Sequence, residues 1–87
     1  MYKFTINFFD AELKRTSFIF SRAKEGIVLL NKQSNFMASV SVDPSDPRII
    51  IMSSANKDYL SFIRNSCFAK MSWCRANIEY VSEIIKY

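Results

Sequence analysis

The chain has 87 residues, of which 49% are hydrophobic and 15% aromatic, and a formal net charge of +4 at pH 7. This length suits a single domain, residues 1–87, with one core and no room for a second. The sequence has no His and one Gly, which excludes a His-based catalytic triad and a glycine-rich phosphate loop. The mild positive charge favours nucleic acids or acidic proteins as partners.

The chain begins with the pattern of a half-buried strand. Apolar and polar side chains alternate over residues 2–9, with Tyr2, Phe4, Ile6 and Phe8 on one face. This alternation differs from the apolar core of a signal peptide, and no apolar run approaches the roughly 18 residues of a membrane span. We therefore expect a cytoplasmic protein, located in the host cytoplasm if a phage encodes it.

Two further strands are predicted for residues 16–21 and 27–32. Gly26 lies between them and suits a tight turn, because glycine adopts a left-handed conformation without strain. The alternative is a helix from Ser21 to Gln33, capped by Ser21, which would give the chain a β-β-α or β-α start.

A β-hairpin is predicted in the middle of the chain. Residues 36–42 alternate between apolar and polar side chains, and residues 48–52 are rich in isoleucine. Between them, residues 43–47 contain two prolines, which interrupt strand pairing and favour a turn.

Residues 55–87 contain neither Gly nor Pro and are predicted to be helical. Apolar residues recur there at spacings of three and four, at Leu60, Ile63, Cys67, Met71, Cys74, Ile78, Val81 and Ile85. The helix would be capped by Ser53, Ser54 or Asn56, with Asp58 in its first turn. An unbroken helix of this length spans about 50 Å, whereas a compact domain of this size is about 30 Å across. We therefore expect either an overhanging helix that packs on a second copy in a homodimer, or a break into two helices near residues 65–73.

Together these elements predict an α+β fold. Residues 1–54 would be mainly β and residues 55–87 helical, with an antiparallel meander of four or five strands and a long or broken C-terminal helix packed on one face. The alternative architecture is a split β-α-β sandwich.

The candidate partner-binding residues lie on the predicted C-terminal helix. A basic ridge of Lys57, Arg64, Arg75 and Lys86, with Phe68 among them, occupies an arc of about 40° opposite the apolar stripe. Such a ridge is either a solvated face or a surface that follows phosphates, with the aromatic ring available for stacking. Because aromatic and arginine side chains dominate binding hot spots, we expect Lys57, Arg64, Phe68 and Arg75 to contact a partner, together with the aromatic residues Trp73 and Tyr87.

Metal and cofactor chemistry finds little support in the sequence. Cys67 and Cys74 are about 10 Å apart in a helix, too far for a disulfide, and two cysteines without His do not make a zinc site. Asp43 and Asp46, with Asp10 or Glu12, are candidate Mg²⁺ ligands for a nuclease, but aspartate next to proline is a common turn initiator. We expect no cofactor and no metal.

The sequence thus favours binding over catalysis. We expect a small non-enzymatic protein that binds a larger cytosolic protein or nucleoprotein machine. Its size and its abundance of residues with AT-rich codons favour a phage or mobile-element inhibitor of the anti-defence or anti-CRISPR type. The alternatives are a dimeric nucleic-acid-binding regulator that uses the basic ridge and, less favoured, a Mg²⁺-dependent nuclease.

Overall fold

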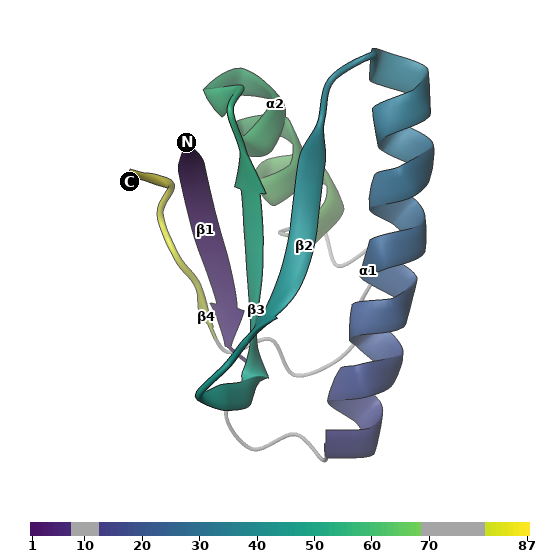
Figure 1. Ribbon diagram of the computed structural model, residues 1–87, viewed down its shortest axis with the longest axis vertical. Coiled ribbons are helices and arrows are strands. Elements are labelled where there is room, and N and C mark those ends of the chain that lie inside the picture. Colours follow the sequence, from purple (N-terminus) through teal and green to yellow (C-terminus); the bar gives the residue numbers. More distant parts are fainter. Residues whose placement is uncertain (8–12, 69–79) are drawn as a thin grey trace.

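The computed structural model describes residues 1–7, 13–68 and 80–87, with side chains described for residues 1–7, 16–65 and 81–87. The elements in chain order are β1 (Tyr2–Asn7), α1 (Leu13–Ser34), β2 (Ala38–Asp43), β3 (Asp46–Ser54), α2 (Lys57–Phe62), the π-helical turn η1 (Ile63–Phe68), β4 (Tyr80–Val81) and β5 (Ile85–Lys86). Figure 1 shows α1 and α2 on the same side of the sheet.

The sheet is antiparallel, and its strands follow the order β2-β3-β1-β4, with β5 also paired to β1. β1 and β2 are joined through α1 and lie on either side of β3. This is the strand order of a split β-α-β sandwich. The α+β class and the antiparallel sheet are confirmed. The predicted meander is wrong, and the strand order matches the alternative, the split β-α-β sandwich.

The core lies between the sheet and the two helices. Alternate residues of β1 and β3 point toward the helices, with Phe4 and Ile50 fully buried, whereas the intervening residues are half-buried on the other face. The helices complete the core with Ile19, Ala23 and Ile27 from α1, and with Tyr59, Leu60 and Ile63 from α2 and η1. Each large apolar side chain buried here contributes about 1.5–3 kcal/mol.

The strands predicted for residues 16–21 and 27–32 are wrong, because both segments belong to α1. The buried positions Thr16, Ile19, Ala23 and Ile27 recur at helical spacing. The alternation that suggested a strand came from Phe18 and Phe20, of which Phe18 is 65% exposed in the helix. The alternative helix over residues 21–33 was the better prediction, although α1 begins earlier.

The predicted turn at Gly26 is also wrong. Gly26 lies inside α1, and its φ is not positive. The left-handed residue is instead Asn35, with φ of 61°, directly after the last residue of α1. Its N–H donates to Asn31 O at 3.1 Å. Asn35 therefore ends the helix as a left-handed C-terminal residue, which asparagine tolerates better than most residues.

The predicted helix over residues 55–87 is wrong at residues 80–87, and residues 69–79 lie outside the described residues. Asn56 caps α2 and Asp58 lies in its first turn, as expected, but residues 80–81 and 85–86 are strands. Residues 80–87 run along the edge of β1 that β3 does not cover, where Ser82 N–H donates to Thr5 O at 2.9 Å and Tyr87 N–H donates to Met1 O at 3.0 Å. The unpaired edge of β1 supplies backbone partners that a helix would leave unused.

The structure contains no overhanging C-terminal helix at residues 80–87, the feature from which a homodimer was expected. That expectation rested on a helix of about 50 Å, whereas the molecule measures 34 × 25 × 22 Å with a radius of gyration of 11.9 Å. The second option, a break into two helices, is wrong for residues 80–87, which include the strands β4 and β5, while most of the predicted break and the start of the second helix lie outside the described residues. Homodimerisation itself stays a prediction.

Candidate functional site

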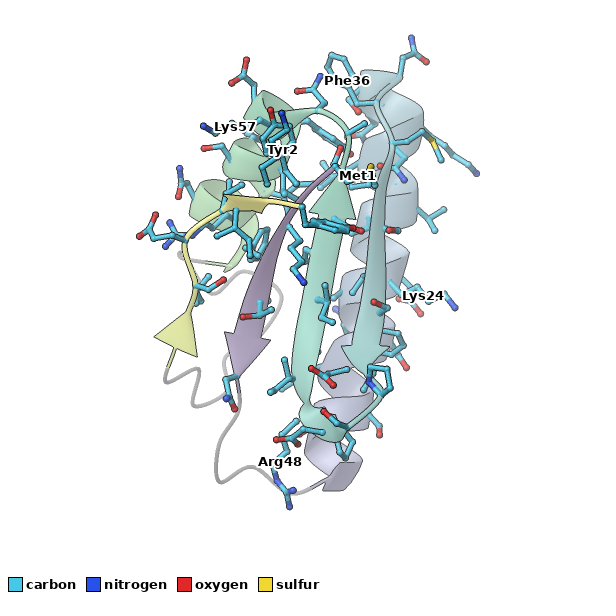
Figure 2. The ribbon with its side chains drawn as sticks, turned by 60° about the vertical axis from the view of Figure 1, so that its left-hand side comes forward. Met1, Tyr2, Lys24, Phe36, Arg48 and Lys57 are labelled. Atoms are coloured by element: carbon cyan, nitrogen blue, oxygen red, sulfur yellow. The ribbon has the colours of Figure 1, made fainter. Side chains whose placement is uncertain are left out.

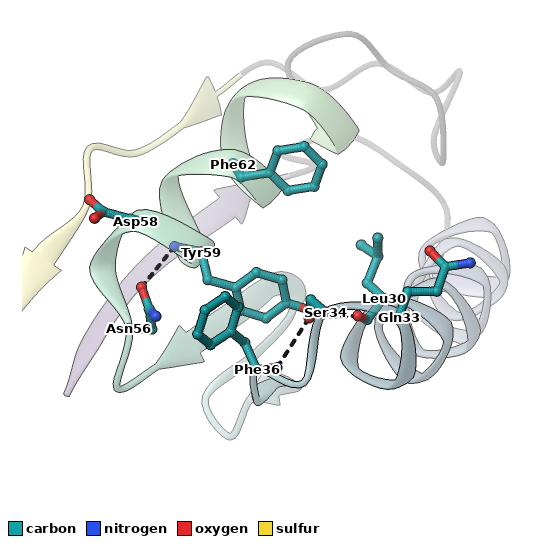
Figure 3. Close-up of a pocket in the computed structure, with 8 residues that line it drawn as sticks. All are labelled: Leu30, Gln33, Ser34, Phe36, Asn56, Asp58, Tyr59 and Phe62. Atoms are coloured by element: carbon teal, nitrogen blue, oxygen red, sulfur yellow. Dashed lines mark hydrogen bonds between the residues drawn. The ribbon is translucent and has the colours of Figure 1, made fainter.

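An open groove lies between the C-terminal end of α1 and the first turns of α2 (Figure 3). It has a volume of about 510 Å³. Its apolar side chains are Leu30 from α1, Phe36 from the loop before β2, and Tyr59 and Phe62 from α2. Gln33, Ser34, Asn56 and Asp58 supply the polar lining.

Asn31 holds the two walls of this groove together. Its side chain bonds both backbone groups of Ala38: Nδ2 donates to Ala38 O at 3.0 Å, and Ala38 N–H donates to Oδ1 at 3.1 Å. Oδ1 also accepts the Tyr59 hydroxyl at 2.8 Å. One asparagine thus connects α1, β2 and α2 with good hydrogen-bond geometry.

Aromatic residues form the floor of the groove. The rings of Phe36 and Tyr59 are tilted by 40°, with centroids 5.4 Å apart. This geometry is favourable for an aromatic pair. Phe36 is still 47% exposed and Phe62 50% exposed, and Figure 3 shows Phe62 and Leu30 directed toward the space between the helices.

The polar groups of the groove mostly serve the fold. Ser34 Oγ donates to Leu30 O at 2.7 Å and accepts Phe36 N–H at 3.2 Å, which shapes the turn after α1. Asn56 Oδ1 accepts Tyr59 N–H at 3.0 Å, the standard bond of a helix N-cap. Asp58 is exposed and makes no ion pair with any described residue. It is therefore the charged group that a ligand in the groove would meet.

This arrangement suits the binding of an apolar side chain better than acid-base chemistry. A general acid or base needs a titratable group within reach of a second functional group, and the groove offers one isolated carboxylate. Among residues 1–7, 13–68 and 80–87, no cluster of three potential metal ligands occurs. Within the same residues, no helix is long and apolar enough to cross a membrane.

Among the predicted partner-binding residues whose side chains the structure describes, Arg64 makes the most hydrogen bonds within the chain. Its Nε donates to Ser82 O at 2.6 Å, and its Nη2 lies 3.4 Å from Val81 O and 3.3 Å from Glu83 Oε1. Nη1 donates to Asn65 Oδ1 at 3.0 Å. The guanidinium therefore attaches the C-terminal strand segment to η1, which leaves few of its donors for a phosphate.

The other predicted partner-binding residues do not come together on one helix. Lys57 is exposed at the start of α2, and Tyr87 is 60% exposed at the end of the chain, where Lys3 Nζ lies 4.9 Å from its ring centroid. Lys86, a member of the basic ridge, is on β5. Trp73 and Arg75 lie outside the described residues, as do the side chains of Phe68, Cys67 and Cys74.

The candidate Mg²⁺ ligands lie in the turn between β2 and β3. Asp43 Oδ1 accepts Ser45 N–H at 2.8 Å and the Ser45 hydroxyl at 2.7 Å, while Asp46 Oδ1 accepts Arg48 N–H at 2.9 Å. The Ser45 hydroxyl, followed by the Ser45 N–H, holds the pKa of Asp43 below its ordinary 3.8. Both carboxylates therefore act as turn residues, and Asp10 and Glu12 lie outside the described residues.

The sequence analysis missed the groove, because its residues come from three separate segments. Phe36 and Tyr59 are 23 positions apart, and Phe36 had been assigned to a strand. The aromatic richness of the chain was the available signal, but it does not indicate which rings stay exposed. Comparison with protein-family models, curated protein sequences and solved structures found no match to this chain.

Proposed function

We propose that this protein is a non-enzymatic interaction module that binds another protein through the groove between α1 and α2. The observation that supports this most is the open groove of about 510 Å³ with Phe36 and Phe62 half-exposed in its lining. Exposed aromatic side chains around a hollow are a common form of binding hot spot, because a partner side chain that fills the hollow excludes water from them.

The expected partner segment has an apolar anchor next to a cation. The anchor would lie between Leu30 and Phe62 and against the ring of Phe36. A lysine or arginine beside it would reach Asp58, which has no ion-pair partner among the described residues. Such a pair at the rim contributes little affinity but sets orientation. An inhibitor of a larger machine, of phage or mobile-element origin, would be one member of this functional class.

Site-directed crosslinking combined with affinity capture tests the proposal. Photoreactive phenylalanine analogues at positions 62 and 18 would be compared in nuclease-treated lysate of the natural host. We expect crosslinking to one protein from position 62 and not from position 18. Capture of the same protein should be lost with Phe36→Ser and Phe62→Ser.

Phe18→Ser is the matched control, because Phe18 is a more exposed aromatic residue on the outer face of α1. It should capture the partner as the wild type does. The proposal fails if no protein is recovered in stoichiometric amounts, or if the two groove variants retain the partner while the control loses it.

The nucleic-acid alternative is less favoured by the geometry. Arg64 is bonded within the chain, and the half-buried positions on the open face of β1 and β3 are Lys3, Thr5, Asn7, Ile49, Ile51 and Ser53, none of them aromatic. The exposed ring of Tyr87 lies beside this face, where it already contacts Lys3 Nζ at 4.9 Å from the ring centroid. Binding to random DNA at low ionic strength, if present, should be weak and strongly salt-dependent.

A further inference from the structure

Among the strands that the structure describes, β2 is the outermost on one side of the sheet, and part of its backbone has no described strand beside it. At Ala38 the outward N–H and C=O are occupied by the Asn31 side chain. Because backbone groups alternate in direction along an antiparallel strand, the N–H and C=O of Val40 and Val42 point outward like those of Ala38. No hydrogen bond from any described residue reaches these outward groups.

A hollow of about 180 Å³ lies directly beside this edge. It is formed by Ile27 and Val28 of α1 together with Val40 of β2. Val28 is 49% exposed although it faces this hollow. A strand added to β2 would place every second side chain on the helix side of the sheet, where the hollow can receive an apolar one.

The positive charge of Lys24 beside the edge of β2 favours an added strand that carries a negative charge. Lys24 borders the same hollow and makes no ion pair with any described residue; Figure 2 shows its side chain extending from α1 into solvent. If two copies paired through β2 about a two-fold axis at Ser41, both Lys24 side chains would lie near that axis and repel each other. A carboxylate on the added strand would instead attract Lys24.

We propose that the outer edge of β2 binds an extended, acidic segment of a partner protein by strand addition. The backbone of the segment bonds to Val40 and Val42, an apolar side chain packs on Val28, and an acidic side chain lies beside Lys24. Main-chain bonds provide the affinity in this mode, and the alternate side chains provide the specificity. The proposal is independent of the groove between α1 and α2.

The test uses a synthetic peptide, acetylated and amidated, of the sequence Thr-Val-Thr-Glu-Thr-Val-Thr. It places Val and Glu on one face and Thr on the other, and the control peptide carries Lys in place of Glu. With ¹⁵N-labelled protein and millimolar peptide, we expect saturable shifts of the Val40 and Val42 amide signals. The Lys peptide should bind at least about threefold more weakly, and Lys24→Glu should reverse this preference.

A backbone variant provides the second arm. Val40→Pro removes the outward N–H without removing a bond to β3, so it should abolish binding, whereas Val40→Thr keeps the N–H and should bind. If Val40→Pro does not fold, the proposal is tested by Lys24→Glu alone, a change at an exposed residue that should reverse the preference between the two peptides. The proposal is overturned if the two amides do not shift, if the wild type does not distinguish the peptides, or if the protein is a dimer that Val40→Pro dissociates.

Discussion

The Tyr59 hydroxyl donates a 2.8 Å hydrogen bond to Asn31 Oδ1, the same oxygen that accepts Ala38 N–H at 3.1 Å. This shared acceptor connects three elements on one side of the groove. We expect Tyr59→Phe to lower the free energy of unfolding by about 1 kcal/mol, because it removes one neutral bond. Asn31→Ala should cost more, about 2–3 kcal/mol, because it also leaves the Ala38 backbone groups without their partner.

Urea denaturation of both single variants and the double variant checks this prediction. The double variant should be less destabilised than the sum of the single changes, since both remove the same bond. Strictly additive effects would contradict the assignment of Asn31 as the common partner.

Arg64→Ala should destabilise the C-terminal strand segment. The guanidinium bonds to Ser82 O at 2.6 Å and contacts Val81 O and Glu83. Bonds that involve a charged group contribute about 1.5–3 kcal/mol each, but the exposed pair with Glu83 adds little. We expect a loss of about 2 kcal/mol in unfolding free energy and faster amide exchange at Ser82 and Tyr87.

Arg64→Lys is the matched control, because it keeps the charge and loses the planar fork. It should retain only part of the stability. If Arg64→Ala leaves amide exchange at residues 80–87 unchanged, Arg64 does not hold this segment in place.

Gly26→Ala should stabilise the protein. Gly26 has helical neighbours on both sides and no positive φ, so alanine fits its backbone and lowers the entropy of the unfolded chain. The expected gain is about 0.5–1 kcal/mol, measured as a rise in the thermal midpoint. Asn35→Ala, at φ of 61°, is the opposite case and should destabilise. A destabilised Gly26→Ala variant would instead support a turn at this position.

The turn at Asp43 should weaken in acid. The Ser45 hydroxyl and N–H lower the pKa of Asp43 in the folded state below 3.8, so its stabilising effect is complete above pH 3.8 and is lost as the pH falls through the lowered value. NMR titration of the Asp43 carboxyl should show this lowered pKa. Ser45→Ala should raise the pKa toward 3.8, whereas Ser41→Ala, on the same hairpin, should not move it.

The helices and strands were predictable from the sequence wherever the hydrophobic pattern fitted only one type of secondary structure. Alternation identified β1 and β2, the isoleucine-rich run over residues 48–52 identified β3, and the two prolines placed the turn between β2 and β3. Asn56 was among the expected caps of α2. At residues 16–32 two readings competed, because Phe18 and Phe20 alternate like a strand while Ile19, Ala23 and Ile27 recur like a helix. The helical pattern prevailed, because it places Ile19, Ala23 and Ile27 on one face of α1, and that face packs against the core.

The sequence by itself determined the α+β class, the antiparallel sheet and the residues available for a core, because periodicity and turn chemistry act between near neighbours in the chain. Tertiary structure alone decided the rest. The end of the chain became strand because β1 offered an unpaired edge, and Arg64 became an internal contact because that strand came within its reach. The groove exists because Asn31 joins residues 7 and 28 positions apart, a relationship that no local pattern carries.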